Sequence, residues 1–138
     1  MILRATFAVI AVLASHVSVA ECFKYPPDVA ELSGTVFLKT FFGPPGYGED
    51  PVGDSKEQQI LMALDAPICI LEGRDDGLEL PESDQRTITL VPQGNRWSTL
   101  RSAAGKHVRV RGLFWHAITA HHHTPLSLEV TSIEVLPK

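Results

Sequence analysis

The stretch "NRWSTLRSAAGKHVRVRGLFWHA" (95–117) decides the fold, because its hydrophobic period changes half-way. A helical period runs through 95–105, where Asn95 can cap the start of a helix and Gly105 can end it. The apolar face of that helix is Trp97, Leu100, Ala103 and Ala104. Residues 106–117 alternate between apolar and polar side chains, the pattern of a strand with one buried face. The sequence therefore predicts one helix followed directly by a strand.

Four further segments predict strands. Three of them precede the helix and one follows the 106–117 strand: 32–41, 58–71, 86–92 and 125–136. The element order is then strand, strand, strand, helix, strand, strand. A helix between the third and fourth of five strands is the element order of the OB-fold. We therefore expect an all-β protein with one helix, folded as a five-stranded OB-fold-like Greek-key barrel.

Two positions interrupt the alternation along these strands. Pro67 lacks a backbone N–H, so it confines its part of the second strand to an edge or a bulge. In the last strand the inward-facing set changes phase at 131–132, which predicts a second bulge. The segment 43–57 is rich in glycine, proline and acids, and it predicts a long loop without a helix.

Residues 1–20 have the pattern of a secretory signal peptide. An apolar core at 6–14, too short to span a bilayer, follows one positive charge, and Ser18 and Ala20 are the small residues that precede a cleavage site. We therefore expect a periplasmic or secreted protein, cleaved near Ala20, with one OB-fold-like domain at 21–138. No later segment approaches 18 consecutive apolar residues, so we expect no transmembrane segment after cleavage.

Cys22 and Cys69 are the two cysteines of the chain. An even number of cysteines in an exported protein predicts a disulfide. The bridge would tie the N-terminal arm to the end of the second strand. Their wide separation excludes the CxxC motif of redox catalysts.

Charge is distributed unevenly along the chain. The formal net charge is −4, which makes nonspecific nucleic-acid binding unlikely. Residues 49–84 are acid-rich, whereas 85–128 contain bases and no acid. The two segments are either complementary solvated faces or, in the alternative interpretation, an acidic face and a basic strip that meets an anionic ligand or partner.

The histidine-rich stretch "HAITAHHHT" (116–124) is the first candidate site. It lies between the last two predicted strands, so it forms a hairpin. Because side chains alternate along a strand, His121 and His123 should share one face while His122 points to the other. We hypothesise that His116 and His121 or His123 converge on Zn²⁺ or Cu²⁺. The alternative is a hairpin whose imidazoles bond to the backbone and cover the barrel mouth.

A ligand site at one barrel mouth is the second candidate. OB-folds bind ligands on the barrel face and through the loops after strands one and four. Here these loops are 41–50, which presents Tyr47, and the histidine-rich hairpin. Arg109, Arg111 and Trp115 lie on one side of the fourth strand and could add a surface for an anionic glycan, a peptidoglycan fragment or a protein edge. Alternatively, Trp115 packs under the N-terminal arm.

Several stretches together resemble the 4431 family of domains of unknown function. They are "LSGTV", "TFFGPPGYG", "LDAPICI", "GKHVRVRGLFWHA" and "AHHHTPLSL", in this order between Leu32 and about Ile133. The resemblance implies an exported bacterial protein with an OB-fold-like barrel and brings no assigned activity. The family's form of the hairpin is similar to HAHTGHHHT, so Ile118 and Ala120 stand here for a histidine and a glycine. One candidate metal ligand is therefore missing.

Neither G-x-S-x-G nor H-E-x-x-H occurs in the chain, so we do not expect an enzyme. We expect an exported cell-envelope binding module for a small anionic ligand or an envelope protein. One alternative is a periplasmic transition-metal protein, with Zn or Cu as the only cofactors indicated. Another is an inhibitor or immunity-type protein that covers a second protein. A metal titration and a pull-down would separate these alternatives.

Overall fold

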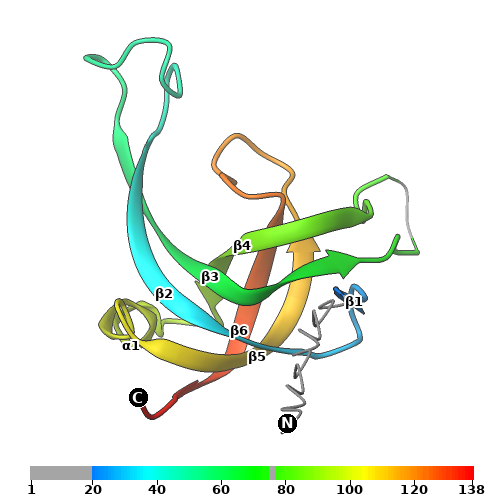
Figure 1. Ribbon diagram of the computed structural model, residues 1–138. Coiled ribbons are helices and arrows are strands. Elements are labelled where there is room, and N and C mark those ends of the chain that lie inside the picture. The colour runs from blue at the N-terminus through cyan, green and yellow to red at the C-terminus, as the bar shows by residue number, and fades with distance from the viewer. Residues whose placement is uncertain (1–19, 75–76) are drawn as a thin grey trace, which may run out of the picture.

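The computed structural model describes residues 20–74 and 77–138 (Figure 1). Its elements are β1 (Glu21–Phe23), β2 (Ala30–Phe42), β3 (Lys56–Ile70), β4 (Glu82–Pro92), α1 (Trp97–Ser102), β5 (His107–His116) and β6 (Leu126–Val135). The predicted signal peptide lies outside the described residues except for Ala20.

Five strands close into a barrel. β2 pairs antiparallel with both β3 and β5, β3 with β4, and β5 with β6. β4 and β6 run parallel and complete the cycle β3–β2–β5–β6–β4, which returns to β3. Because α1 lies between the third and fourth barrel strands in the sequence, the predicted OB-fold-like architecture is confirmed.

The barrel interior is filled by the inward-facing residues of the alternating strands. Among the largest of them are Phe114, Ile60, Met62, Ile70, Ile88, Leu90, Leu126, Leu128, Val36 and Val108. Gly34 and Gly112 stand where a Cβ atom would collide with the backbone of Ala63 and of Glu129. Strongly curved neighbouring strands can therefore approach closely at these two points.

Both predicted bulges are present. The β3–β4 register moves from Ala63↔Thr87 to Ile68↔Gln85, so the irregular part of β3 contains Pro67. The β5–β6 register moves from Arg111↔Ser132 to Gly112↔Val130 and leaves Thr131 unpaired. The proline and the phase change therefore mark the interruptions correctly.

The structure adds a short strand that the sequence pattern did not predict. β1 has three residues, too few for an alternation to be recognised, and it pairs parallel with the end of β3. Cys22 lies directly opposite Cys69 in this pairing, and the two form a disulfide with Cα atoms 4.4 Å apart. The predicted bridge between the N-terminal arm and a strand end is confirmed.

The helix is shorter than the predicted 95–105. α1 has six residues; Arg96, not Asn95, is its N-cap residue and makes no side-chain cap hydrogen bond. Leu100 is buried in the core, whereas Trp97 is 47% exposed and belongs to a different surface. In the part of the chain that the structure describes, no helix is long and apolar enough to cross a membrane.

Candidate functional site

A pocket forms where β3 and β4 separate. Their ladder ends at the pair Leu61↔Thr89, beyond which β3 stays paired with β2 and β4 pairs with β6. Figure 1 shows β2 and β3 rising together away from β4. The opening holds a pocket of about 350 Å³. It is lined by 57–60 of β3, 89–91 of β4, Trp97, Trp115, Ser127, His121 and His122.

The loop between β5 and β6, residues 117–125, contributes His121 and His122 to the pocket; we call it the histidine loop. Its end is tied to β4 through Thr124, whose hydroxyl accepts the Thr89 backbone N–H at 3.1 Å. The same hydroxyl lies 2.7 Å from the Thr89 hydroxyl and donates to the Leu126 carbonyl at 2.8 Å. The loop is therefore fixed to the strand that forms one wall of the pocket.

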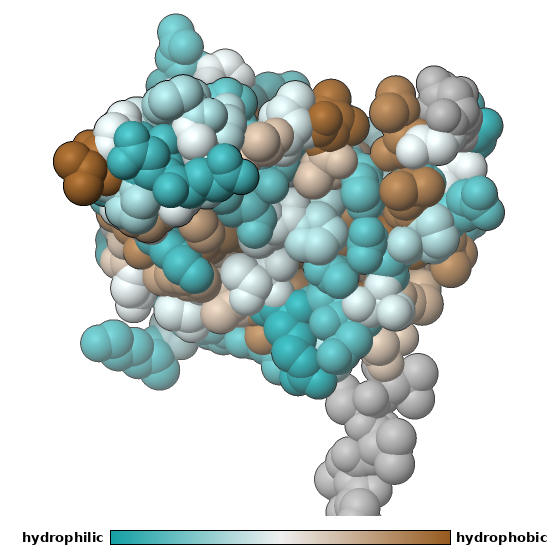
Figure 2. Space-filling model, turned by 90° about the horizontal axis from the view of Figure 1, so that it is seen from above, coloured by the Kyte–Doolittle hydropathy of each residue, from teal (hydrophilic) through white to brown (hydrophobic). Residues whose placement is uncertain are grey.

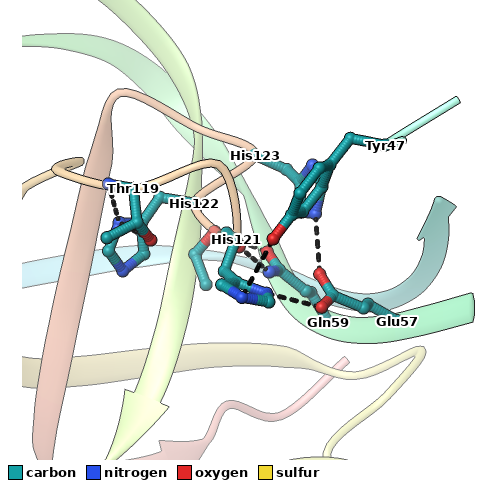
Figure 3. Close-up of polar contacts among 8 residues, drawn as sticks. Tyr47, Glu57, Gln59, Thr119, His121, His122 and His123 are labelled. Carbon is teal, nitrogen blue, oxygen red and sulfur yellow. Dashed lines mark hydrogen bonds and ion pairs between the residues drawn. The ribbon is translucent and has the colours of Figure 1, made fainter. Parts of the chain in front are cut away.

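Glu57 holds the histidine loop from β3 (Figure 3). One carboxylate oxygen lies 2.5 Å from His121 Nδ1 and the other 3.3 Å from His123 Nε2. The adjacent outward residue, Gln59, donates its amide N–H to the His121 carbonyl. The His123 ring also stacks flat on Phe41, with ring centroids 4.0 Å apart. One acid on β3 therefore positions two of the three histidines.

Tyr47 reaches the same loop from the β2–β3 connection. Its hydroxyl lies 3.1 Å from His121 Nε2, and the two rings meet edge to face at 5.4 Å (Figure 3). The predicted association of the loop after the first barrel strand with the loop after the fourth is therefore present. His121 is contacted on both ring nitrogens, by Tyr47 and by Glu57.

Asp54 shapes the loop that carries Tyr47. Its carboxylate accepts the backbone N–H groups of Gly46 and Gly48 at 2.6 Å each, and that of Asp50 at 3.3 Å. Burial raises the pKa of Asp54, but these donors lower it by more, so the net pKa lies below its ordinary value. Tyr47 has a φ of 52°, a left-handed conformation that is uncommon for a residue with a Cβ. The charged acceptor stabilises this turn.

His122 has a separate role within the loop. Its Nδ1 accepts the backbone N–H groups of Ile118 at 3.0 Å and Thr119 at 3.1 Å, so this nitrogen carries a lone pair. Its ring meets Trp115 edge to face at 4.6 Å. Burial and the neighbouring His121 and His123 lower the pKa of His122, which favours the neutral ring that these contacts need.

The remaining predicted site residues lie elsewhere. His116 Nε2 is 2.7 Å from a carboxylate oxygen of Glu82 on β4. Arg109 pairs with Glu134 at 3.4 Å, and both Arg109 and Arg111 pair with Glu31. The arginines therefore form ion pairs with acids on β2 and β6 and are not among the residues that line the pocket. Trp115 does line it, beneath His122 and not under the N-terminal arm.

The three histidines predicted as metal ligands are not brought together. His116 bonds to Glu82, whereas His121 and His123 share Glu57, because 121–123 belong to the loop and not to β6. Within residues 20–74 and 77–138, no group of three His, Cys, Asp or Glu side chains could hold a metal ion.

Among the residues that line the pocket, only Trp115, His121 and His122 were anticipated as site residues. Glu57 looked like one member of an acidic run, and Trp97 like part of a buried helix face. Gln59 and Ser127 carry no sequence signal beyond their outward phase on β3 and β6. Their shared location follows from the separation of β3 and β4, which strand patterns alone do not predict.

Comparison with known families supplies one match. Residues 87–134 match the family described as "Domain of unknown function (DUF4431)". The resemblance predicted from the sequence is confirmed over this segment, which runs from β4 to β6 and includes both tryptophans and the histidine loop. No curated protein and no solved structure matches the chain.

Proposed function

We propose that this protein is an exported binding module of the cell envelope, whose small ligand enters the pocket between β3, β4 and the histidine loop. The pocket itself carries the proposal. Its volume of about 350 Å³ falls within the range of small-molecule sites. It lies against the second and third barrel strands and the loop after strand four, which belong to the region at which OB-folds bind ligands. Tyr47, from the loop after strand one, does not line the pocket but contacts its lining residue His121.

The surroundings of the pocket also favour binding. Seen from above, the side of the molecule at the top of Figure 1 is mainly hydrophilic, with separate hydrophobic patches (Figure 2). A small ligand can therefore bury apolar surface better inside the pocket than on this face. The bonds from Glu57, Tyr47 and Thr124 hold the histidine loop in place before a ligand arrives, which reduces the ordering cost of binding.

Export is supported by two features. Residues 1–20 have the composition of a signal peptide. The Cys22–Cys69 disulfide is of a kind that persists in oxidising compartments and is rare in the cytosol. Both features are consistent with a protein that acts in the periplasm or outside the cell.

Mass spectrometry of a ligand that stays bound to the protein through gel filtration tests the proposal. The purified protein is equilibrated with the small-molecule fraction of a periplasmic extract, separated by gel filtration and denatured, and the released compounds are identified. Val91→Trp fills the pocket from β4, while Val52→Trp, at a side chain that is 97% exposed, is the matched control. We expect a compound from the wild type and V52W but not from V91W. No compound, or equal release from V91W, would overturn the proposal.

A further inference from the structure

Both tryptophans of the chain line the pocket. Trp97 begins α1 and is 47% exposed. Trp115 lies on β5, and His122 meets its ring edge to face. An indole ring offers a wide, flat apolar surface with a negative face. The C–H groups on one side of a sugar ring carry partial positive charge and stack well on such a surface.

Ser127 supplies an unused polar group in the same pocket. It lies on β6, opposite Thr89 of β4 and Trp115 of β5, and its side chain is fully buried. Among the described residues, its Oγ is the buried side-chain oxygen or nitrogen without a hydrogen-bond partner. The neighbouring Thr89 hydroxyl, in contrast, bonds to Thr124 and Gln59. An unpaired buried hydroxyl is costly, so it is expected where a ligand completes the bond.

The charge of the pocket favours a neutral ligand. Its lining contains one carboxylate, Glu57, and neither lysine nor arginine. Arg101 donates to Gln58 at 2.7 Å but is not part of the lining. Phosphate or carboxylate groups would therefore meet the Glu57 carboxylate, which is bonded to His121 and His123, with no lysine or arginine in the lining to bind them. A neutral polyol would find hydroxyl and amide partners.

We infer that the pocket binds a neutral sugar ring, stacked on a tryptophan, with one hydroxyl or acetamido group hydrogen-bonded to Ser127 Oγ. This inference rests on the proposed binding function and names its ligand class. The ring is either a free monosaccharide or the end of a glycan chain, since both offer the same chemistry to the pocket.

Intrinsic fluorescence reports directly on this site, because the chain contains only the two tryptophans that line it. The protein is titrated with glucose, N-acetylglucosamine, the β-1,4-linked disaccharide of N-acetylglucosamine, and glucuronate. We expect saturable changes with a neutral sugar below about 10 mM. Glucuronate should bind at least about tenfold more weakly. Tighter binding of the disaccharide identifies a glycan chain, and equal binding identifies a free sugar.

Ser127→Ala is the decisive variant, and Ser98→Ala, at an exposed position of α1, is its control. We expect S127A to weaken sugar binding by about fivefold, the effect of one hydrogen bond, and S98A to leave it unchanged. Circular dichroism checks that both variants are folded. If no neutral sugar binds while a compound is still released in the mass-spectrometric test, the sugar assignment is wrong and the binding function stands. Sugar binding unaffected by S127A would overturn the assignment of Ser127.

Discussion

Ser127→Ala should stabilise the protein. The Ser127 hydroxyl is buried without a partner, and such a group costs about 1–3 kcal/mol. Removing one oxygen atom leaves a void of about 10 Å³, which costs about 0.2 kcal/mol. Taking the lower end of the range, the free energy of unfolding should rise by about 1 kcal/mol. For a domain of about 120 residues, this corresponds to an increase in Tm of about 4 °C.

Urea denaturation and thermal melts followed by circular dichroism measure the effect. The midpoint should rise with an unchanged m value, which locates the change in the folded state. Thr89→Val, at the residue of β4 that lies opposite Ser127, is the comparison variant. It removes a hydroxyl that bonds to Thr124 at 2.7 Å, so it should destabilise the protein by about 1 kcal/mol.

A destabilised S127A protein would refute this reasoning, because it would show that the hydroxyl has a favourable partner in the unliganded protein. An unchanged midpoint would do the same, since it would mean that solvent in the pocket already satisfies the oxygen. A stabilised variant that binds sugar poorly would show a residue retained for binding at a cost in stability.

Three further predictions concern the loops and the disulfide. Asp54→Asn weakens the acceptor of the Gly46 and Gly48 N–H groups, so their hydrogen exchange should accelerate; unchanged protection would contradict the assigned role. Because the pKa of His122 is lowered from about 6.5, its stabilising contribution is complete above that value and lost as the pH falls below it. On acidification from pH 7 to 5, the Tm should therefore decrease and the fluorescence of Trp115 should change. His122→Ala should abolish this fluorescence change. Reducing the disulfide, which closes a segment of 47 residues, should lower the free energy of unfolding by about 4 kcal/mol, measured by urea denaturation with and without reductant.

The barrel could be predicted because the pattern that defines each strand lies within a few consecutive residues of the sequence. The alternation in 106–117 gives the buried face of β5 directly, and the helical period before it fixes the element order. Pro67 and the phase change at 131–132 mark bulges because each alters a backbone pattern within a few residues. β1 could not be predicted, since its three residues are too few to show a period.

The site was predicted in part. Tyr47 and His121 were correctly assigned to loops that meet, since the OB-fold places these loops at one barrel end. The partners of the histidines were not predicted, because Glu57 lies more than sixty positions away and contacts them only through the curvature of β3. Ser127 could not be identified from the sequence either, since the lack of a hydrogen-bond partner for its hydroxyl is visible only in the packed structure.

The two ring contacts of His121 have a kinetic consequence. Tyr47 holds one nitrogen from the β2–β3 connection and Glu57 holds the other from β3, so the loops of two separate hairpins are linked through one imidazole. Because these contacts are already made in the unliganded protein, neither loop has to become ordered when a ligand arrives. Association should then be limited by diffusional encounter and not by a conformational step. The observed rate in stopped-flow experiments should therefore increase linearly with the ligand concentration, and a plateau would contradict this view.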